Sequence, residues 1–171
     1  MIRLPQPLGL ARRAALQESD FVKTLLLALA TAVALAFIRP ASVYADAGWG
    51  TDLKKAQEEA KSSNKLVLLD FTGSDWCGWC MRFNKEVFSQ SAFKDYASKN
   101  LVLVEVDFPR AKPQSSDLRK QNQQLAEQYQ VQGFPTIVVL NGSGRKVWQF
   151  DGYFPKGPDA FIAELEKARK S

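Results

Sequence analysis

Residues 66–80 have the sequence LVLLDFTGSDWCGWC, and this segment decides the fold. Its first part belongs to an apolar run over residues 65–71, which has the length of a strand and the composition of one covered on both faces. Gly73-Ser74-Asp75 ends the strand, and a helical pattern follows over residues 81–88. The segment therefore predicts a strand and a helix joined by a turn that contains two cysteines.

The rest of the sequence predicts three more strands and the helices around them. A buried strand is expected over residues 101–107, and two further strands over 136–140 and 146–150 flank the hairpin signal Asn141-Gly-Ser-Gly144. Helical patterns occupy residues 51–62, the segment from about Ser91, the segment after Ser116 and the segment from Gly157 onward. Thr51 is the expected N-cap of the first of them. This order predicts an α/β fold, with a mixed central sheet and helices on both faces.

The composition excludes several kinds of chemistry. The chain has 171 residues, which suits one domain, with a formal charge of +5, two cysteines and no histidine. Without histidine there is no serine–histidine or cysteine–histidine dyad and no imidazole base or ligand. Two cysteines cannot by themselves fill the four positions of a structural zinc site, and no metal is expected. The chemistry must therefore use thiols, carboxylates, amines or the backbone.

The first 45 residues have the pattern of a secretory signal peptide. Residues 24–38 form an uncharged apolar run of 15 residues after a basic start, and small residues alternate over 41–47. We expect cleavage after Ala45, which leaves residues 46–171 as the folded domain. The alternative is an uncleaved membrane anchor, although a spanning helix needs about 20 apolar residues. The domain is expected to be exported to the periplasm or cell envelope of a bacterium.

The net positive charge comes mostly from this segment. Residues 1–45 hold five of the 23 basic and two of the 18 acidic residues, so residues 46–171 carry 18 basic and 16 acidic groups, or +2. A nearly neutral domain lacks the compositional signature of a nucleic-acid-binding protein, and no nucleic-acid partner is expected.

The two cysteines are spaced for reversible disulfide chemistry. Cysteines three positions apart on a helix share a face, with Cα atoms about 5 Å apart, inside the ~4.4–6.8 Å range of a disulfide. Cys77 is expected where the free N–H groups and the helix dipole converge, which stabilises a thiolate. We therefore predict that Cys77 is the exposed nucleophile and Cys80 the shielded resolving thiol.

These features resemble the thioredoxin superfamily over residues 50–170. The resemblance rests on the strand–WCGWC–helix unit, on Gly133-Phe134-Pro135-Thr136 before the hairpin, and on the order of elements. The sequences FTGSDWCGWC at 71–80 and EVFS at 86–89 are similar to exported thioredoxin-like disulfide reductases. They are also similar to the C-terminal domain of membrane thiol:disulfide interchange proteins. The resemblance implies that Pro135 is a cis-proline beside the cysteines and that Phe134 and Thr136 contact an extended substrate segment.

Other residues are expected to support the active site. Trp76, Gly78 and Trp79 flank the cysteines, with ordinary surface packing as the alternative for the two tryptophans. Asp70 is similar to the family's buried acid, which assists deprotonation of the resolving cysteine, although one extra residue separates it from the motif. The residues leave a solvated carboxylate at the strand end as the alternative. The loop over residues 108–117 is longer than compact members require and is a candidate surface for partners.

The sequence predicts a thiol-disulfide oxidoreductase that reduces or isomerises disulfides of exported proteins without a cofactor. Because no histidine lies beside Cys77, we expect reductase or isomerase behaviour rather than strong oxidation. The expected partners are disulfide-containing protein substrates and a membrane-linked thiol electron donor. The first alternative is a binding or chaperone-like module of the same fold with a static disulfide. A second is an iron–sulfur site in which two chains each supply Cys77.

Overall fold

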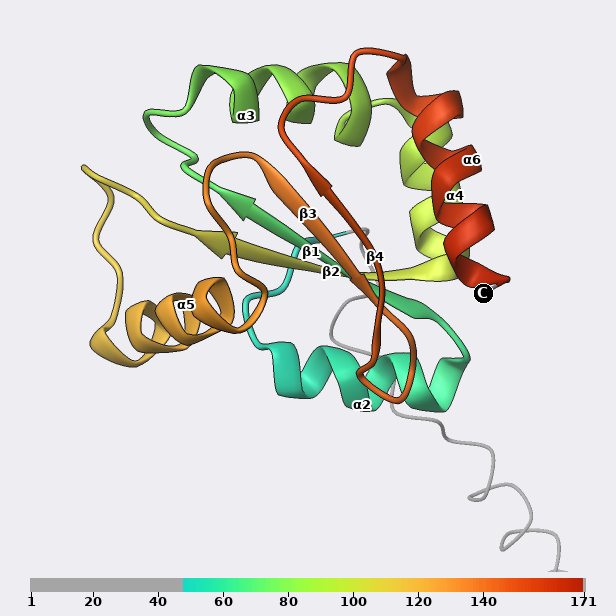
Figure 1. The fold of residues 1–171 in the computed structure, drawn as a ribbon, viewed down its shortest axis with the longest axis horizontal. Helices are drawn as coiled ribbons and strands as arrows, with labels where there is room; N and C mark the ends of the chain where they lie inside the picture. The colour runs from blue at the N-terminus through green and yellow to red at the C-terminus, as the bar shows by residue number, and fades with distance from the viewer. Residues whose placement is uncertain (1–47, 171) are drawn as a thin grey trace, which may run out of the picture. The chain divides into compact units, whose positions relative to one another are not determined.

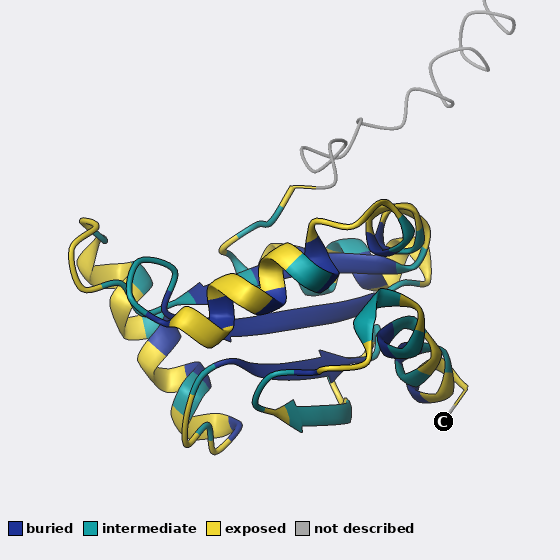
Figure 2. Cartoon of the chain, turned by 90° about the horizontal axis from the view of Figure 1, so that it is seen from above, coloured by how far each residue is buried: buried dark blue, intermediate teal, exposed yellow. Residues whose placement is uncertain are grey.

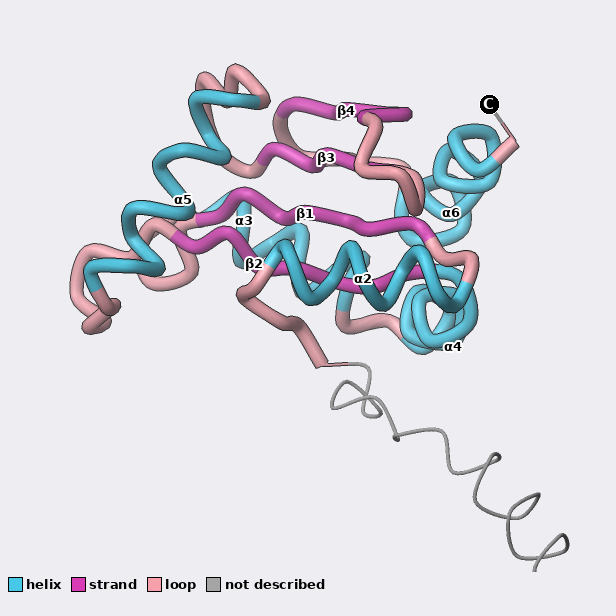
Figure 3. Tube along the Cα trace, turned by 90° about the horizontal axis from the view of Figure 1, so that it is seen from below, coloured by secondary structure: helices cyan, strands magenta, loops and turns pink. Residues whose placement is uncertain are grey.

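The computed structural model describes residues 48–170, in which four strands form one mixed sheet (Figure 1). The strand order is β2-β1-β3-β4, as the tube in Figure 3 shows. β1 (Leu66–Thr72) pairs in parallel with β2 (Leu101–Asp107) and antiparallel with β3 (Thr136–Leu140). β3 pairs antiparallel with β4 (Lys146–Asp151), which closes the predicted hairpin. The predicted parallel pair and mixed sheet are confirmed.

Helices cover both faces of this sheet, as the sequence predicts (Figure 1). One face is covered by α2 (Leu53–Ser63) and α5 (Ser116–Gln128). The other is covered by α3 (Gly78–Phe83), the π-helix η1 (Asn84–Phe88), α4 (Ser91–Asn100) and α6 (Gly157–Arg169). Figure 2 shows dark blue central strands among helices whose outward faces are exposed.

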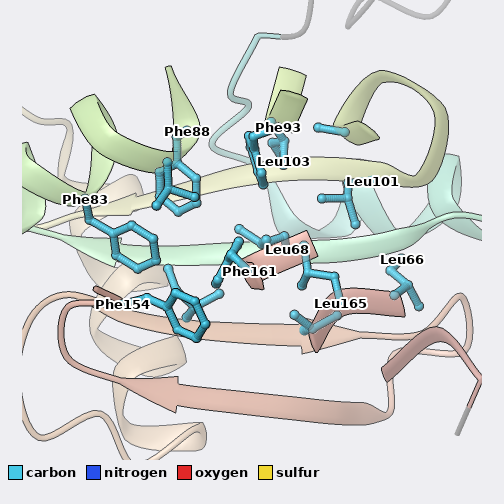
Figure 4. Packing of buried hydrophobic residues seen from close by; sticks show 14 residues of the cluster. Leu66, Leu68, Phe83, Phe88, Phe93, Leu101, Leu103, Phe154, Phe161 and Leu165 are labelled. Carbon is cyan, nitrogen blue, oxygen red and sulfur yellow. The ribbon is translucent and has the colours of Figure 1, made fainter. Parts of the chain in front are cut away.

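Alternating side chains of β1 enter two separate cores because successive residues of a strand point to opposite faces. Val67, Leu69 and Phe71 pack toward α2 and α5, whereas Leu66 and Leu68 pack toward α4 and α6. All seven residues of β1 are buried, which explains its nearly continuous apolar sequence. Figure 4 shows the second core, which is rich in phenylalanine. The sheet therefore forms a rigid base for the turn that follows β1.

The N-cap of the first described helix lies one residue later than predicted. The carboxylate of Asp52, and not Thr51, is the N-cap group of α2, accepting a hydrogen bond of 3.1 Å from the backbone N–H of Lys55. Aspartate and threonine are both good caps, so the local sequence does not distinguish the two positions.

The predicted signal peptide, over residues 1–45, lies outside the described residues. Between residues 48 and 170, none of the helices combines the length and hydropathy that a membrane-spanning segment requires. At the start of the described chain, Gly50 pairs with Val104 at the free edge of β2 through two backbone hydrogen bonds. This contact places Trp49 against Phe88, with ring centroids 5.0 Å apart.

Candidate active site

The two cysteines form a disulfide at the junction between β1 and α3. Their Cα atoms are 5.3 Å apart, in agreement with the predicted spacing. Cys77 is the N-cap of α3, and its Sγ accepts a hydrogen bond of 3.2 Å from the backbone N–H of Cys80. When the pair is reduced, this N–H and the positive end of the helix stabilise a thiolate at Cys77. The helix begins at Gly78, three residues before the predicted start at Met81, because the cysteine itself supplies the cap.

The predicted contrast in exposure between the two cysteines is wrong for the disulfide form. Cys77 is 6% exposed and Cys80 is 4% exposed. The bond ties the Cys77 side chain against the first turn of α3, so both side chains are buried in this form. Gly78 between them is exposed, and a Cβ atom there would meet nothing within 4 Å. Gly78 therefore leaves open space beside the disulfide.

Trp76 is held in place from three sides. Its indole Nε1 donates a hydrogen bond of 2.8 Å to the carbonyl of Phe108, and the Arg110 guanidinium lies 3.9 Å from its ring centroid. The ring also packs edge-on against Phe134, with centroids 5.9 Å apart. Gly73 lies close to the indole, because a Cβ atom at that position would be only 2.5 Å from Trp76 Cε2. Trp76 thus connects the cysteine turn to both neighbouring loops.

Asp75 anchors the loop that follows β2. Its Oδ1 accepts a hydrogen bond of 3.0 Å from the N–H of Arg110, and its Oδ2 accepts bonds of 2.7 Å and 3.0 Å from Ala111 and Lys112. These backbone donors hold the pKa of the Asp75 carboxyl below its ordinary value. The predicted partner-contact loop is therefore tied to the cysteine turn. No local signal in the sequence indicates this role of Asp75, because its partners lie some 35 positions away.

We expect the substitution Asp75→Asn to loosen this loop. An asparagine offers one oxygen and one N–H₂ group, so at least one backbone N–H of residues 110–112 loses its acceptor. Hydrogen–deuterium exchange of these amides should accelerate roughly tenfold at neutral pH. Because the folded pKa of Asp75 is lowered, its contribution is present at neutral pH and lost as the pH falls through that value. Unchanged protection in the variant would show that the loop holds itself in place, and Asp117→Asn on exposed α5 is the control.

Trp79 forms the other side of the active site and projects outward. It is 56% exposed, and the neighbouring Met81 is 50% exposed. Its ring lies 5.4 Å from that of Tyr153, whose hydroxyl donates a hydrogen bond to Glu86. Glu86 also pairs with Arg82 at 2.9 Å, and these two partners hold the pKa of Glu86 below its ordinary value. The Trp79 ring is thus a positioned apolar surface next to the disulfide.

The Phe134–Pro135 peptide bond is cis. The carbonyl of Pro135 accepts a hydrogen bond of 2.8 Å from the N–H of Gly152, which joins the segment to the end of β4. Phe134 stacks on Phe108 with centroids 5.1 Å apart, in addition to its contact with Trp76. The residues before β3 and the cysteine turn therefore belong to one cluster.

The Thr136 side chain is placed differently from the expectation for a substrate-binding group. It is 1% exposed, and its hydroxyl lies 2.9 Å from the carbonyl of Gly133 and 3.0 Å from the carboxylate of Asp151. These contacts support the hairpin, so the side chain has an internal structural role.

Asp70 is buried beside Cys80, and the alternative of a solvated carboxylate is wrong. It follows Leu68 on the same face of β1, is 8% exposed and lines a cavity of about 130 Å³ together with Cys80. Its Oδ1 accepts no hydrogen bond from any residue between 48 and 170. Burial raises its pKa from 3.8 to about 8, and the nearby Glu105 and Asp107 carboxylates add to this effect. The extra residue in the turn has thus not displaced the acid from the resolving cysteine.

Residues 48–170 contain no group of three or more histidine, cysteine, aspartate or glutamate side chains arranged to hold a metal ion.

A redox-capable cysteine pair at the start of a helix, a cis-proline segment and this sheet order together define a thioredoxin-like protein. The chain belongs to the thioredoxin-like domain family, whose sequence pattern matches residues 53–169. It is 38% identical over 116 residues to the disulfide bond reductase DsbH of Chlamydia pneumoniae, which covers 68% of this chain and 69% of that protein. The thiol:disulfide interchange protein DsbD of Vibrio cholerae is 34% identical over 97 residues, covering 57% of this chain and 15% of DsbD.

Solved structures agree with this assignment. A DsbH oxidoreductase structure superposes with a TM-score of 0.67 and 34% identity, covering 78% of this chain and 92% of that one. The oxidised C-terminal domain of DsbD from Neisseria meningitidis has a TM-score of 0.53 at 22% identity, which shows a shared fold. That match covers 71% of this chain and 99% of that one. The chain is therefore a thioredoxin-like oxidoreductase with a C-x-x-C pair at Cys77 and Cys80.

Proposed function

We propose that the chain reduces or isomerises disulfides of exported proteins through the Cys77–Cys80 dithiol. The observation that carries this proposal is the disulfide at the N-terminus of α3, with the Cys80 N–H directed at the Cys77 sulfur. The similarity to the disulfide bond reductase DsbH supports the reducing direction. The apolar run before residue 48 supports export to a bacterial periplasm or envelope, where a membrane-linked thiol donor would restore the dithiol.

The reaction proceeds through two thiol–disulfide exchanges. The Cys77 thiolate attacks a sulfur of the substrate disulfide, forms a mixed disulfide and releases one substrate thiolate. Cys80 then attacks Cys77, forms the intramolecular disulfide and releases the second substrate thiolate. Two electrons pass from the protein dithiol to the substrate. The exposed Trp79 ring and the exposed Met81 side chain offer an apolar surface beside the reacting sulfur atoms.

Asp70 is positioned to accept the proton of Cys80 during the second exchange. Both residues line the same cavity, and the Asp70 pKa of about 8 is close to that of an ordinary thiol. Proton transfer between groups of similar pKa needs little driving force in either direction, which suits an acid–base partner for a thiol. The same carboxyl group can return the proton when the disulfide is reduced again.

A redox titration of the Cys77–Cys80 pair tests the proposal. The full-length chain is equilibrated in dithiothreitol or glutathione buffers, and its free thiols are then trapped and counted. We expect a reduction potential near ~−270 mV, the value of thioredoxin, together with reduction of a disulfide-containing test protein such as insulin. A potential near ~−120 mV would reverse the assigned direction. A pair that fails to cycle would instead favour the binding module with a static disulfide.

A further inference from the structure

A second carboxyl group, that of Glu105, lies beside the cavity at Asp70 and has no assigned role. Asp70 and Glu105 are direct partners in the parallel register of β1 and β2. Side chains at paired positions of adjacent strands point to the same face of the sheet, and here that face carries α3 and η1. Asp70, Glu105 and Cys80 all line the cavity of about 130 Å³. The register therefore places two carboxyl groups from neighbouring strands next to the resolving cysteine.

The two carboxyl groups differ in their access to water. Asp70 is buried with an unpartnered oxygen, whereas Glu105 is only partly buried. Within residues 48–170 no side-chain hydrogen bond or ion pair engages the carboxyl group of Glu105. Asp70 has little direct contact with bulk water, because only 8% of its surface is exposed. Glu105 is the neighbouring group that can take a proton from Asp70 and also reach solvent.

The remaining charged groups around the cavity are already engaged. The Asp107 carboxylate accepts a hydrogen bond of 2.8 Å from the N–H of Ser74 and one of 2.6 Å from its hydroxyl. Lys112 donates a hydrogen bond of 3.0 Å to the same Ser74 hydroxyl. Burial and the Asp107 carboxylate raise the pKa of Glu105, and the positive charge of Lys112 opposes them. The Glu105 carboxylate disfavours ionisation of Asp70 and adds to the effect of burial, which raises the pKa of Asp70.

We propose that Glu105 relays protons between Asp70 and solvent each time Cys80 gains or loses its proton. The relay rests on the proposed function and deepens it. In the second exchange, Asp70 in its ionised form accepts the proton of Cys80, and the Cys80 sulfur forms the bond to Cys77 as the Cys77–substrate bond breaks. Asp70 passes the proton to Glu105, which releases it to water, and the departing substrate thiolate takes a proton from water. The two electrons move as before, and the protons balance.

The test measures the second exchange alone. Reduced full-length chain is mixed with oxidised glutathione at concentrations where the rate no longer depends on glutathione, and tryptophan fluorescence reports disulfide formation. We expect Glu105→Gln to slow this phase about tenfold between pH 6 and pH 8, and Glu105→Asp to restore part of the rate. Glu127→Gln, which removes an exposed carboxylate on α5, is the matched control and should keep the original rate.

Two further measurements separate a relay from a structural effect. Glu105→Ala opens space at the cavity, so added imidazole should restore its rate in proportion to concentration and leave the unsubstituted protein unaffected. The carboxyl ¹³C NMR shift of Asp70 in the oxidised protein should change with pH in two linked steps. In Glu105→Gln, Asp70 should titrate in a single step at a lower pH.

The relay and the proposed function fail in different ways. An unsubstituted protein that does not react with oxidised glutathione would overturn both. An active protein whose Glu105→Gln variant reacts at the same rate would overturn the relay alone. The relay would also be overturned if Glu105→Gln reacts more slowly, but imidazole does not restore the rate of Glu105→Ala and the Asp70 titration is unchanged. Glu105 would then have a structural role.

Discussion

Replacing Cys77 with serine is expected to abolish disulfide reduction, with a loss of about 10³-fold or more in turnover. Cys77 is the N-cap of α3, and the Cys80 N–H directed at its sulfur stabilises the attacking thiolate. A serine hydroxyl in the same place remains protonated at neutral pH and attacks disulfides far more slowly. The rate of insulin reduction by the full-length chain, supplied with dithiothreitol as electron donor, measures this loss.

The variant Cys80→Ser provides the matched control, because it keeps the nucleophile and removes only the resolving thiol. Cys77 can still attack, but the mixed disulfide has no internal thiol to release it. We expect this variant to accumulate mixed disulfides with substrate that a reductant cleaves, whereas Cys77→Ser accumulates none. Non-reducing gels and mass spectrometry of the trapped species give the readout. Full activity in Cys77→Ser would exclude the exchange mechanism and leave the static disulfide as the explanation.

The strands were predictable from the sequence because their signals are local. β2 (Leu101–Asp107) and β3 (Thr136–Leu140) have the predicted bounds, since each is an apolar run between polar or glycine-containing segments. The predicted helix over residues 81–88 is in fact α3 followed by the π-helix η1 (Asn84–Phe88). A cysteine cap is not among the usual N-cap signals, and a π-helical turn has no pattern of its own in the sequence.

The active site was predictable only in part, for a related reason. The disulfide and the segment before β3 depend on residues a few positions apart, which a motif can show. The three bonds between Asp75 and residues 110–112, and the pairing of Asp70 with Glu105, join positions about 35 apart in the sequence. These contacts depend on the register between β1 and β2. Hydrophobic patterning alone does not determine that register, because a shift by two residues keeps the same side chains on the same face.

Replacing Asp70 with asparagine is expected to stabilise the oxidised protein by several kcal/mol at pH 9. The ordinary pKa of 3.8 is raised to about 8 in the folded protein, so the folded state binds an extra proton between these values. The stabilisation from that proton is complete below about pH 4 and is lost as the pH rises through 8. Asparagine, which carries no charge, avoids the cost of a buried carboxylate at high pH.

Urea unfolding of the oxidised chain at pH 5, 7 and 9 measures this effect, with the exposed Asp95→Asn as control. The stability difference between Asp70→Asn and the unsubstituted protein should rise with pH in favour of the variant, whereas the control difference should stay constant. A difference independent of pH would mean that Asp70 ionises normally and is no proton acceptor. The stabilised variant should also complete the second exchange more slowly, because Cys80 has lost its base. Asp70 would then destabilise the fold at high pH and accelerate the reaction. Its presence at this position is explained by its role in the reaction and not by packing.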